Sequence, residues 1–334
     1  MVPSKGVVWI YWGWGSFSMR KISETSPGEL GRHEATISGS GPPGSAQAAT
    51  SATQSPRSHR QRSAGPARAV DVARQDLARF QESLLDLPTV QLGGLPITVI
   101  DRPNAARLMI AAARGHIRSS RPYYFTSANG DVIAQALANV DVAVLFREAD
   151  QIFADGQPLV FASRLLCSRH LPERVATTDL FYDVAELAEQ EGTTFYLLGS
   201  TEAENNKAVA SVKARYPGLR IVGHCHGFLA GQALEKKLDE INALSPDILW
   251  LGLGVPREQI FVRDFASRLQ NVGVIKTSGG LFDHIAGKVR RAPLWVQKAG
   301  FEWLWRALME PRRLFWRYFT TSPRAVYALL RYSK

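Results

Sequence analysis

The feature that most constrains the fold is a series of short apolar runs that alternate with helical segments. Runs such as "TFYLLGS", "RIVGH", "DILWLGLG" and "VGVIKTSGG" each end at or near glycine, and predicted helices separate them at 201–215, 232–244 and 256–269. Short runs that are apolar throughout are typical of strands buried on both faces, and alternation with helices favours parallel pairing. The sequence therefore predicts an α/β fold in which helices cover a parallel sheet.

The same alternation begins at Leu92. "LPITVID", "PYYFTSAN" and "QIFADG" are predicted strands of this series, and "NAARLMIAAARGHI", "GDVIAQALANV" and "PLVFASRLLC" are predicted helices. "VDVAVLFREA" fits either a helix or a strand, and we favour a helix. The predicted α/β core extends over residues 89–286.

Composition separates residues 1–70 from this core. They begin with the aromatic patch "VVWIYWGWGSF" and continue as a Ser/Gly/Pro/Ala-rich run that cannot bury enough apolar surface to fold. We interpret them as a disordered or non-native extension; a targeting role for the patch is the alternative, which its short, glycine-interrupted apolar run disfavours. Residues 71–88 are predicted to form a short amphipathic helix. The two cysteines, Cys167 and Cys225, argue against a disulfide framework and fit a reducing compartment.

The C-terminal segment 287–334 carries most of the charge imbalance. It holds eleven Lys/Arg against two Asp/Glu, a net +9 of the formal +10, and ten of the 32 aromatic residues. Pro311 and Pro323 are expected to divide it into about three helices, with Ser322 as an N-cap. Interleaved arginines and aromatics favour helices that associate with an anionic membrane surface. A packed helical lid is the alternative, and the density of Trp, Leu and Phe argues against a nucleic-acid partner.

Five predicted strands end in residues suited to a ligand site. Ligands of open α/β sheets bind beyond the carboxyl ends of the strands, where glycine allows close approach to the backbone and helix N-termini favour anions. A phosphate-bearing ligand is therefore expected there. From the residues alone, Asp155 is either a cap for the helix at 157–167 or a functional carboxylate. The marked positions are Asn129, Asp155, Gly199, Gly254 and Gly279–Gly280.

Missing motifs narrow the chemistry. The sequence has no G-x-x-x-x-G-K-[ST] loop, no G-x-G-x-x-G after the first strand, no H-E-x-x-H, no paired C-x-x-C and no D-x-D. The segment "HCHG" at 224–227 lacks an evident fourth ligand and points its side chains to opposite faces, which disfavours zinc. We expect neither a metal nor a cofactor, so arginines and backbone N–H groups would have to neutralise a bound diphosphate.

Eight segments that follow in one order carry a family resemblance: "TSAN" (126–129), "ADG" (154–156), "PERV..TDL" (172–180), "YLLGS" (196–200), "YPGLRIVGHCHGF" (216–228), "LGLGVPREQIFV" (251–262), "GGLFDHIAGKVRRAP" (279–293) and "FEWLWRALMEPRRLFWRY" (301–318). From about Leu92 to Tyr318 the chain resembles the WecG/TagA/CpsF family of bacterial glycosyltransferases, which is glycosyltransferase family 26. The resemblance implies a Rossmann-like fold. It implies an inverting, metal-independent transfer of a hexosyl group from a UDP-sugar to a polyprenyl-diphosphate-linked saccharide, in surface polysaccharide or exopolysaccharide biosynthesis. Such an enzyme would lie peripherally on the cytoplasmic face of the plasma membrane, and a homo-oligomer would be compatible with it.

The resemblance also assigns roles to residues. It implies that Asp155 is the catalytic base, which accepts the proton of the attacking acceptor hydroxyl. It places Thr126 and Asn129 beside the donor and acceptor sugars, Arg174 near the leaving diphosphate, and Gln259 and Asp283 against the donor. Without the resemblance, Arg174 would be interpreted as a surface ion pair with Glu173. The C-terminal arginines that it implies are Arg290, Arg291, Arg306, Arg312 and Arg313.

Two departures from the family pattern leave questions open. The family usually has P-K-Q-E where this chain has Pro256-Arg257-Glu258-Gln259, so either Glu258 or Gln259 would face the donor. Thr177 stands where the family often has glycine, which alters how closely the backbone can approach the donor. A non-catalytic nucleotide-sugar-binding module is the alternative function, and a nucleotide-dependent oxidoreductase is disfavoured by the missing dinucleotide motif.

Overall fold

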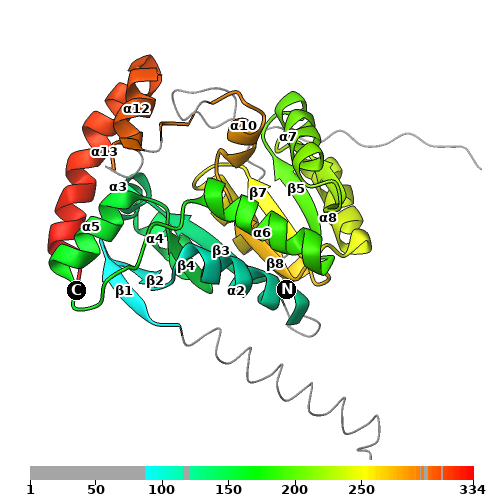
Figure 1. The fold of residues 1–334 in the computed structure, drawn as a ribbon, viewed down its shortest axis with the longest axis horizontal. Coiled ribbons are helices and arrows are strands. Elements are labelled where there is room, and N and C mark those ends of the chain that lie inside the picture. Colours follow the sequence, from blue (N-terminus) through cyan, green and yellow to red (C-terminus); the bar gives the residue numbers. More distant parts are fainter. Residues whose placement is uncertain (1–86, 116–120, 290, 294, 297–299, 310) are drawn as a thin grey trace, which may run out of the picture. The chain divides into compact units, whose positions relative to one another are not determined.

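The computed structural model describes residues 87–115, 121–289, 291–293, 295–296, 300–309 and 311–334 (Figure 1). The predicted extension at 1–70 and all but the last two residues of the predicted helix at 71–88 lie outside the described residues. Six strands form one parallel sheet in the order β4-β3-β8-β7-β5-β6. Their bounds are β3 (Tyr123–Ala128), β4 (Gln151–Ala154), β5 (Thr194–Gly199), β6 (Arg220–Cys225), β7 (Ile248–Gly252) and β8 (Val274–Thr277). The predicted α/β fold with a parallel sheet is confirmed.

Helices cover both faces of this sheet, because alternate strand residues point to opposite sides. Phe125, Phe195 and Trp250 face one core, which helices α2, α6, α7 and α10 close. Tyr124 and Tyr196 face the other core, which α8 and α9 close. The helix bounds are α2 (Arg102–Gly115), α3 (Gly130–Ala138), α4 (Val140–Arg147), α5 (Gln157–Leu166), α6 (Thr177–Glu191), α7 (Glu202–Arg215), α8 (Gly231–Leu244), α9 (Arg257–Phe265), the 3-10 turn η1 (Ala266–Arg268) and α10 (Leu281–Ile285).

Helices α4 and α6 show where local sequence patterns predicted the secondary structure and where a helix was missed. "VDVAVLFREA" forms helix α4, so the preference for a helix is confirmed. Helix α6 was not predicted, although its buried residues Leu180, Phe181, Val184 and Ala188 follow the helical spacing of an amphipathic helix. Helix α6 matters for function because its first turn lies at the site described below.

The segment "LPITVID" forms a strand, but its predicted place in the parallel series is wrong. β2 (Leu95–Thr98) pairs antiparallel with β1 (Thr89–Leu92) in a separate two-stranded sheet. The turn between the strands consists of Gly93 and Gly94, whose φ angles of +57° and +85° suit a tight hairpin. The two-residue turn fixes the register of β2 against β1, its neighbour in the sequence.

The C-terminal segment forms α12 (Glu302–Met309) and α13 (Pro311–Tyr332). Pro311 begins α13, but Pro323 lies inside it, so the prediction that Pro323 divides the segment and that Ser322 caps a new helix is wrong. The buried residues Ala328 and Leu329 join the core around α3, α4, α5 and the hairpin. This packing compensates for the helix hydrogen bond that a proline cannot donate.

The end of α13 is tied to the hairpin by backbone hydrogen bonds. The N–H of Gly94 donates to the carbonyl of Tyr332, and the N–H of Lys334 donates to the carbonyl of Gln91, each at 3.1 Å. Among the described helices, none combines the length and the apolar character needed to cross a membrane. The two backbone hydrogen bonds and the burial of Ala328 and Leu329 pack the C-terminal part of α13 onto the hairpin and the core.

Candidate active site

The predicted site lies where five neighbouring parallel strands end. Strands β4, β3, β8, β7 and β5 are consecutive in the sheet, so the residues that follow them share one edge. Asp155 follows β4 and Asn129 follows β3, and the N–H of Asp155 donates to the carbonyl of Ala128 at 2.8 Å. Asn129 also caps α3, because its side chain accepts a hydrogen bond from the N–H of Val132 at 3.1 Å. The sheet order thus brings Asp155 and Asn129 together.

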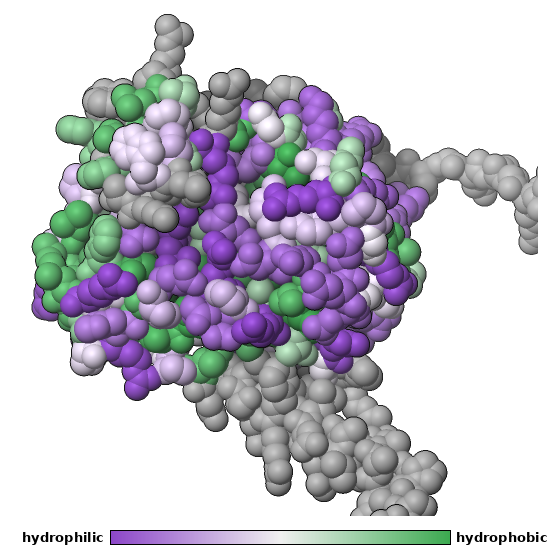
Figure 2. All heavy atoms as spheres, viewed as in Figure 1, coloured by the Kyte–Doolittle hydropathy of each residue, from purple (hydrophilic) through white to green (hydrophobic). Residues whose placement is uncertain are grey.

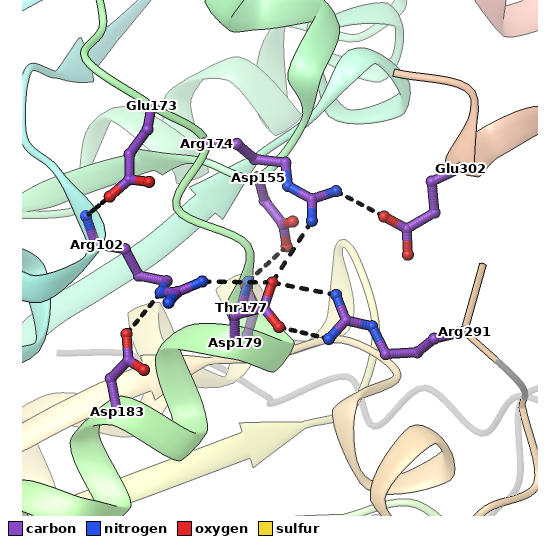
Figure 3. Close-up of polar contacts among 9 residues, drawn as sticks. All are labelled: Arg102, Asp155, Glu173, Arg174, Thr177, Asp179, Asp183, Arg291 and Glu302. Carbon is purple, nitrogen blue, oxygen red and sulfur yellow. Dashed lines mark hydrogen bonds and ion pairs between the residues drawn. The ribbon is translucent and has the colours of Figure 1, made fainter. Parts of the chain in front are cut away.

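Asp155 does not cap the helix that follows it. Gly156 is the N-cap of α5, with no side-chain cap hydrogen bond. The Asp155 carboxylate instead accepts a 3.2 Å hydrogen bond from the N–H of Thr177, at the beginning of α6 (Figure 3). The open N–H groups and the dipole of a helix N-terminus favour a carboxylate at this position. Helix α6 therefore orients Asp155 from across the site.

The surroundings of Asp155 act on its pKa in opposite directions. The residue as a whole is intermediate between buried and exposed. Protein atoms nevertheless remove most of its hydration, and this burial raises the pKa of Asp155 above its ordinary value. Hydrogen bonds from Thr177 and the charges of Arg174 and Lys276 oppose that rise. Asp155 is therefore a carboxylate with a raised proton affinity, as a general base requires.

Three arginines converge on Asp179, which lies in the first turn of α6 (Figure 3). Arg291 donates to both carboxylate oxygens of Asp179. Arg174 lies 3.5 Å and Arg102 lies 3.8 Å from Asp179 Oδ2. Burial alone would raise the pKa of Asp179, but the hydrogen bond and charge of Arg291, with the other two arginines, lower it. Asp179 is thus ionised and orients a cluster of cations beside Asp155.

Arg174 has a different partner from the one considered in the sequence. Its Nη1 donates to Glu302 of α12 at 2.6 Å, while Glu173 accepts a hydrogen bond from the backbone N–H of Arg102 at 2.8 Å. The interpretation of Arg174 as a surface pair with Glu173 is therefore wrong. The Arg174 side chain is only 14% exposed, and its bond to Glu302 links the C-terminal segment to the site.

On the other face of the sheet, Thr126 is fully buried and accepts hydrogen bonds from Thr277 at 2.7 Å and from Gln259 at 3.4 Å. The neighbouring Glu258 accepts a hydrogen bond from the N–H of Gly279 at 2.9 Å. Glu258 and Gln259 are 3% and 1% exposed, so both lie beneath the strand ends and neither is open to solvent. Thr126 and Gln259 are therefore hydrogen-bonded to each other beneath the strand ends, on the opposite face of the sheet from Asp155.

The remaining predicted positions occupy the β7 and β5 side. Gly199, with φ +153°, is so close to β7 that a Cβ would lie 2.3 Å from the carbonyl oxygen of Gly252. Gly254, with φ +79°, precedes α9 and has open space where a Cβ would be. Asp283, which the resemblance places against the donor, lies in α10, where it accepts a 2.5 Å hydrogen bond from Ser200. Gly199 and Gly254 thus lie at the same edge of the sheet as Asp155, at the ends of β5 and β7, and Asp283 lies in the helix that follows β8.

The C-terminal arginines are described only in part. Arg291 belongs to the cluster around Asp179. Arg290 lies outside the described residues. Arg306 is in α12 and Arg312 and Arg313 are in α13, but their side chains are likewise outside the description.

Sequence reasoning missed a buried lysine behind the site. Lys276 of β8 is 0% exposed, and its Nζ donates to Ser127 Oγ at 2.9 Å and to the carbonyl of Thr277 at 2.7 Å. Burial lowers the pKa of Lys276 to about 8, against the opposite effect of Asp155 and Glu258. The available signal was a charged residue inside the otherwise apolar run "VGVIKTSGG". Asp179 and Glu302 were also missed as partners of the arginines.

No metal-binding group stands out in the described part of the chain: its His, Cys, Asp and Glu residues form no cluster of three or more that could bind an ion. In the "HCHG" segment, a ring nitrogen of His224 lies 2.9 Å from Asn205 Oδ1. The amide of Asn205 in turn donates to the carbonyls of Gly199 and Cys225, each at 3.0 Å. This segment therefore braces β5 against β6.

Known proteins give the site its context. The chain is 28% identical over 219 residues to the N-acetylglucosaminyldiphosphoundecaprenol N-acetyl-beta-D-mannosaminyltransferase of Bacillus spizizenii. The aligned residues make up 66% of this chain and 83% of that protein. Proteins with the same name from Bacillus subtilis and Staphylococcus aureus are each 26% identical to this chain. The alignment with the Bacillus subtilis protein spans 63% of this chain and 79% of that protein, and the alignment with the Staphylococcus aureus protein spans 59% and 76%. Residues 90–334 match the family described as the glycosyl transferase WecG/TagA/CpsF family. That match spans more than half of the chain, so the resemblance seen in the sequence is confirmed: the chain is a glycosyltransferase of the WecG/TagA/CpsF family.

Proposed function

We propose that this chain is an inverting, metal-independent hexosyltransferase that moves a sugar from a UDP-sugar to a polyprenyl-diphosphate-linked saccharide. The names of its relatives describe transfer of a mannosaminyl group to a diphosphoundecaprenol-linked N-acetylglucosamine, which supports a lipid-linked acceptor. The observation that carries the proposal is the position of Asp155 beside Arg174 and the Asp179 cluster, at the carboxyl edge of the sheet. A base and a set of cations are the two elements that such a transfer needs.

In the proposed reaction, the acceptor hydroxyl attacks the anomeric carbon of the donor sugar. The new carbon–oxygen bond forms as the bond to the diphosphate breaks, and UDP leaves with the bonding electron pair. Asp155 accepts the hydroxyl proton, as a general base within reach of the nucleophile. A single displacement inverts the anomeric configuration.

The leaving diphosphate requires positive charge close to the breaking bond. Arg174 and Arg291 would supply it, because a planar guanidinium binds phosphate oxygens through two parallel hydrogen bonds. Asp179 holds Arg291 through both of its terminal nitrogens and so fixes the plane of that guanidinium before the donor arrives. This arrangement supports a mechanism that needs no divalent cation.

The apolar surface supports a site of action at the membrane. Phe161 and Leu165 of α5 are 47% and 83% exposed, and Figure 2 shows apolar residues gathered over α5, α12 and α13. Exposed apolar residues of the C-terminal segment include Trp295, Phe301, Leu304, Leu308, Met309, Phe319, Val326, Tyr327 and Leu330. Contiguous apolar surface of this kind marks an interaction site. We propose that α5, α12 and α13 rest on the anionic cytoplasmic face of the plasma membrane, where a lipid-linked acceptor would be found.

Vesicle binding tests the membrane part. Leu165→Glu should weaken co-sedimentation with vesicles that contain anionic lipid by roughly tenfold, since a Leu side chain contributes about 1.5–3 kcal/mol when it leaves water. Phe228→Glu is the matched control, because Phe228 is 67% exposed but follows β6, at the opposite edge of the sheet from β4. Equal loss in both variants, or none in Leu165→Glu, would contradict docking through α5. A dimer that disappears in Leu165→Glu would assign this surface to a second copy of the chain instead.

Transfer itself is tested by incubating a panel of UDP-sugars with a short-chain polyprenyl-diphosphate saccharide and detecting the product by mass spectrometry. Wild type should give a product in the presence of a chelator, and Asp155→Asn should lose it while a thermal shift shows that UDP still binds. UDP binding without transfer from any donor would favour the nucleotide-sugar-binding module. A requirement for a divalent cation would refute the metal-independent mechanism.

A further inference from the structure

A buried ammonium group lies on the same side of the sheet as Asp155. Lys276 is in register with Phe125 of β3 and Trp250 of β7, and Ser127 is in register with Phe153 of β4. Because side chains alternate along a strand, Lys276, Ser127 and Asp155 all point to the face that α6 covers. An unpaired ammonium group is costly to bury, so a lysine here must be compensated by its surroundings.

Hydroxyl groups connect Lys276 to Asp155. Lys276 Nζ donates to Ser127 Oγ at 2.9 Å, and the hydroxyls of Ser127 and Thr177 are hydrogen-bonded at 3.1 Å. The N–H of Thr177 then donates to Asp155 Oδ2 at 3.2 Å. Three hydrogen bonds therefore lead from the ammonium group to the carboxylate.

The other charges near Asp155 are placed differently. Arg174, in the loop before α6, and Arg291, after α10, act on Asp155 from the open side, with side chains 14% and 28% exposed. Lys276 acts from within the core, and the charge of Glu258 of α9 also acts on it and favours its ionised form. A bound diphosphate would engage the two arginines, and its negative charge would raise the pKa of the nearby carboxylate. Lys276 is fully buried and would keep its effect on Asp155 after the donor binds.

We propose that Lys276 is a positioning residue for Asp155, which acts through the hydroxyls of Ser127 and Thr177 to keep the carboxylate ionised and oriented when the donor is bound. This inference rests on the proposed function, in which Asp155 is the base. It adds that the proton affinity of the base is controlled from within the core by a residue that no substrate touches.

The test compares Lys276→Met, which keeps the length of the side chain without its charge, with Thr177→Val and Thr177→Ser. In Lys276→Met the acid limb of the pH profile of kcat/KM should move to higher pH, because the positive charge that lowers the pKa of Asp155 is removed. Thr177→Val should move it in the same direction, and Thr177→Ser, which keeps the hydroxyl, should restore it. The KM for the UDP-sugar should change in none of the three.

A direct titration separates this inference from the proposed function. Carboxyl ¹³C NMR of Asp-labelled protein, with the Asp155 signal identified by its loss in Asp155→Asn, measures the pKa whether or not transfer is detected. An Asp155 titration that is the same in wild type, Lys276→Met and Thr177→Val would overturn the role of Lys276. If Lys276→Met does not fold, Ser127→Ala decides instead, because it removes the hydroxyl between Lys276 and Thr177 and leaves Thr177 itself in place; an unchanged Asp155 titration in Ser127→Ala would overturn the role of Lys276. Absence of transfer in wild type would instead overturn the proposed function.

Discussion

Replacing Asp179 by asparagine tests the arginine cluster most directly. The carboxylate accepts two hydrogen bonds from Arg291 and lies near Arg174 and Arg102. An amide keeps one acceptor oxygen but turns an NH₂ group toward the second nitrogen of Arg291, so one bond is lost and two donors face each other. The arginines would also be left close together without an anion between them.

The size of the effect follows from the exposure of the pair. The side chain of Asp179 is 23% exposed and that of Arg291 is 28% exposed. Fully exposed pairs contribute about 0–1 kcal/mol, whereas breaking a buried pair costs ~3–5 kcal/mol. We expect Asp179→Asn to lower the free energy of unfolding by about 2 kcal/mol, which corresponds to ~4–8 °C in Tm for a chain of this size. Affinity for UDP should fall as well, because the arginines lose their orientation.

The dependence on pH gives this prediction a defined sign. The pKa of Asp179 is lowered by folding, so its stabilising contribution is complete above the ordinary carboxylate pKa of ~4 and is lost as pH falls through the folded value below it. The stability difference between wild type and Asp179→Asn, measured by urea denaturation at several pH values, should therefore shrink only below about pH 4.

Asp183→Asn is the matched control, because Asp183 lies one turn further along α6 and pairs with Arg102 at 2.6 Å. It should lower stability by about 1 kcal/mol or less, as its partner is more exposed, and should leave the affinity for UDP unchanged. The reasoning is refuted if both variants weaken UDP binding equally, or if Asp179→Asn is as stable as wild type at neutral pH.

Three further predictions concern the base, the C-terminal helix and the strand ends. Because burial raises the pKa of Asp155 and only its ionised form accepts a proton, kcat/KM should fall on acidification at a pH above ~4; an acid limb below that value would contradict the environment described here. Leu329→Ala should cost ~2–4 kcal/mol in urea denaturation, and an unchanged midpoint would contradict the packing of α13 on α3. Gly199→Ala should lower the free energy of unfolding by more than ~2 kcal/mol, because the added Cβ would collide with the Gly252 carbonyl. Gly231, with φ +54°, has open space around it, so Gly231→Ala should lower it by about 1 kcal/mol. Equal losses in the two variants would contradict the close approach of β5 and β7.

The alternation of strands and helices could be predicted from the sequence, but the interaction partners of individual side chains could not. Glycine after an apolar run predicted the ends of β5, β7 and β8, because a turn depends on the backbone preferences of adjacent residues. The order of the strands is not local, and it decides that Asn129 and Asp155 meet. Arg174 shows the limit clearly, since its partner Glu302 lies 128 positions away, whereas the neighbouring Glu173 binds elsewhere. The burial of Lys276 likewise depends on the whole fold, so its position as a buried charged group beside the site could not be predicted from the neighbouring residues.

The first turn of α6 connects the two halves of the proposed mechanism. Thr177, its first residue, donates its N–H to Asp155, the proposed base, and Asp179, two residues later, orients the arginines that would meet the diphosphate. A helical turn moves as a unit, because its backbone groups share one hydrogen-bond network. Any shift of this turn would therefore change the orientation of the base and of the cations together. Since both must be in place at the moment of bond breaking, a common support on one helical turn makes donor binding and proton acceptance geometrically dependent on each other.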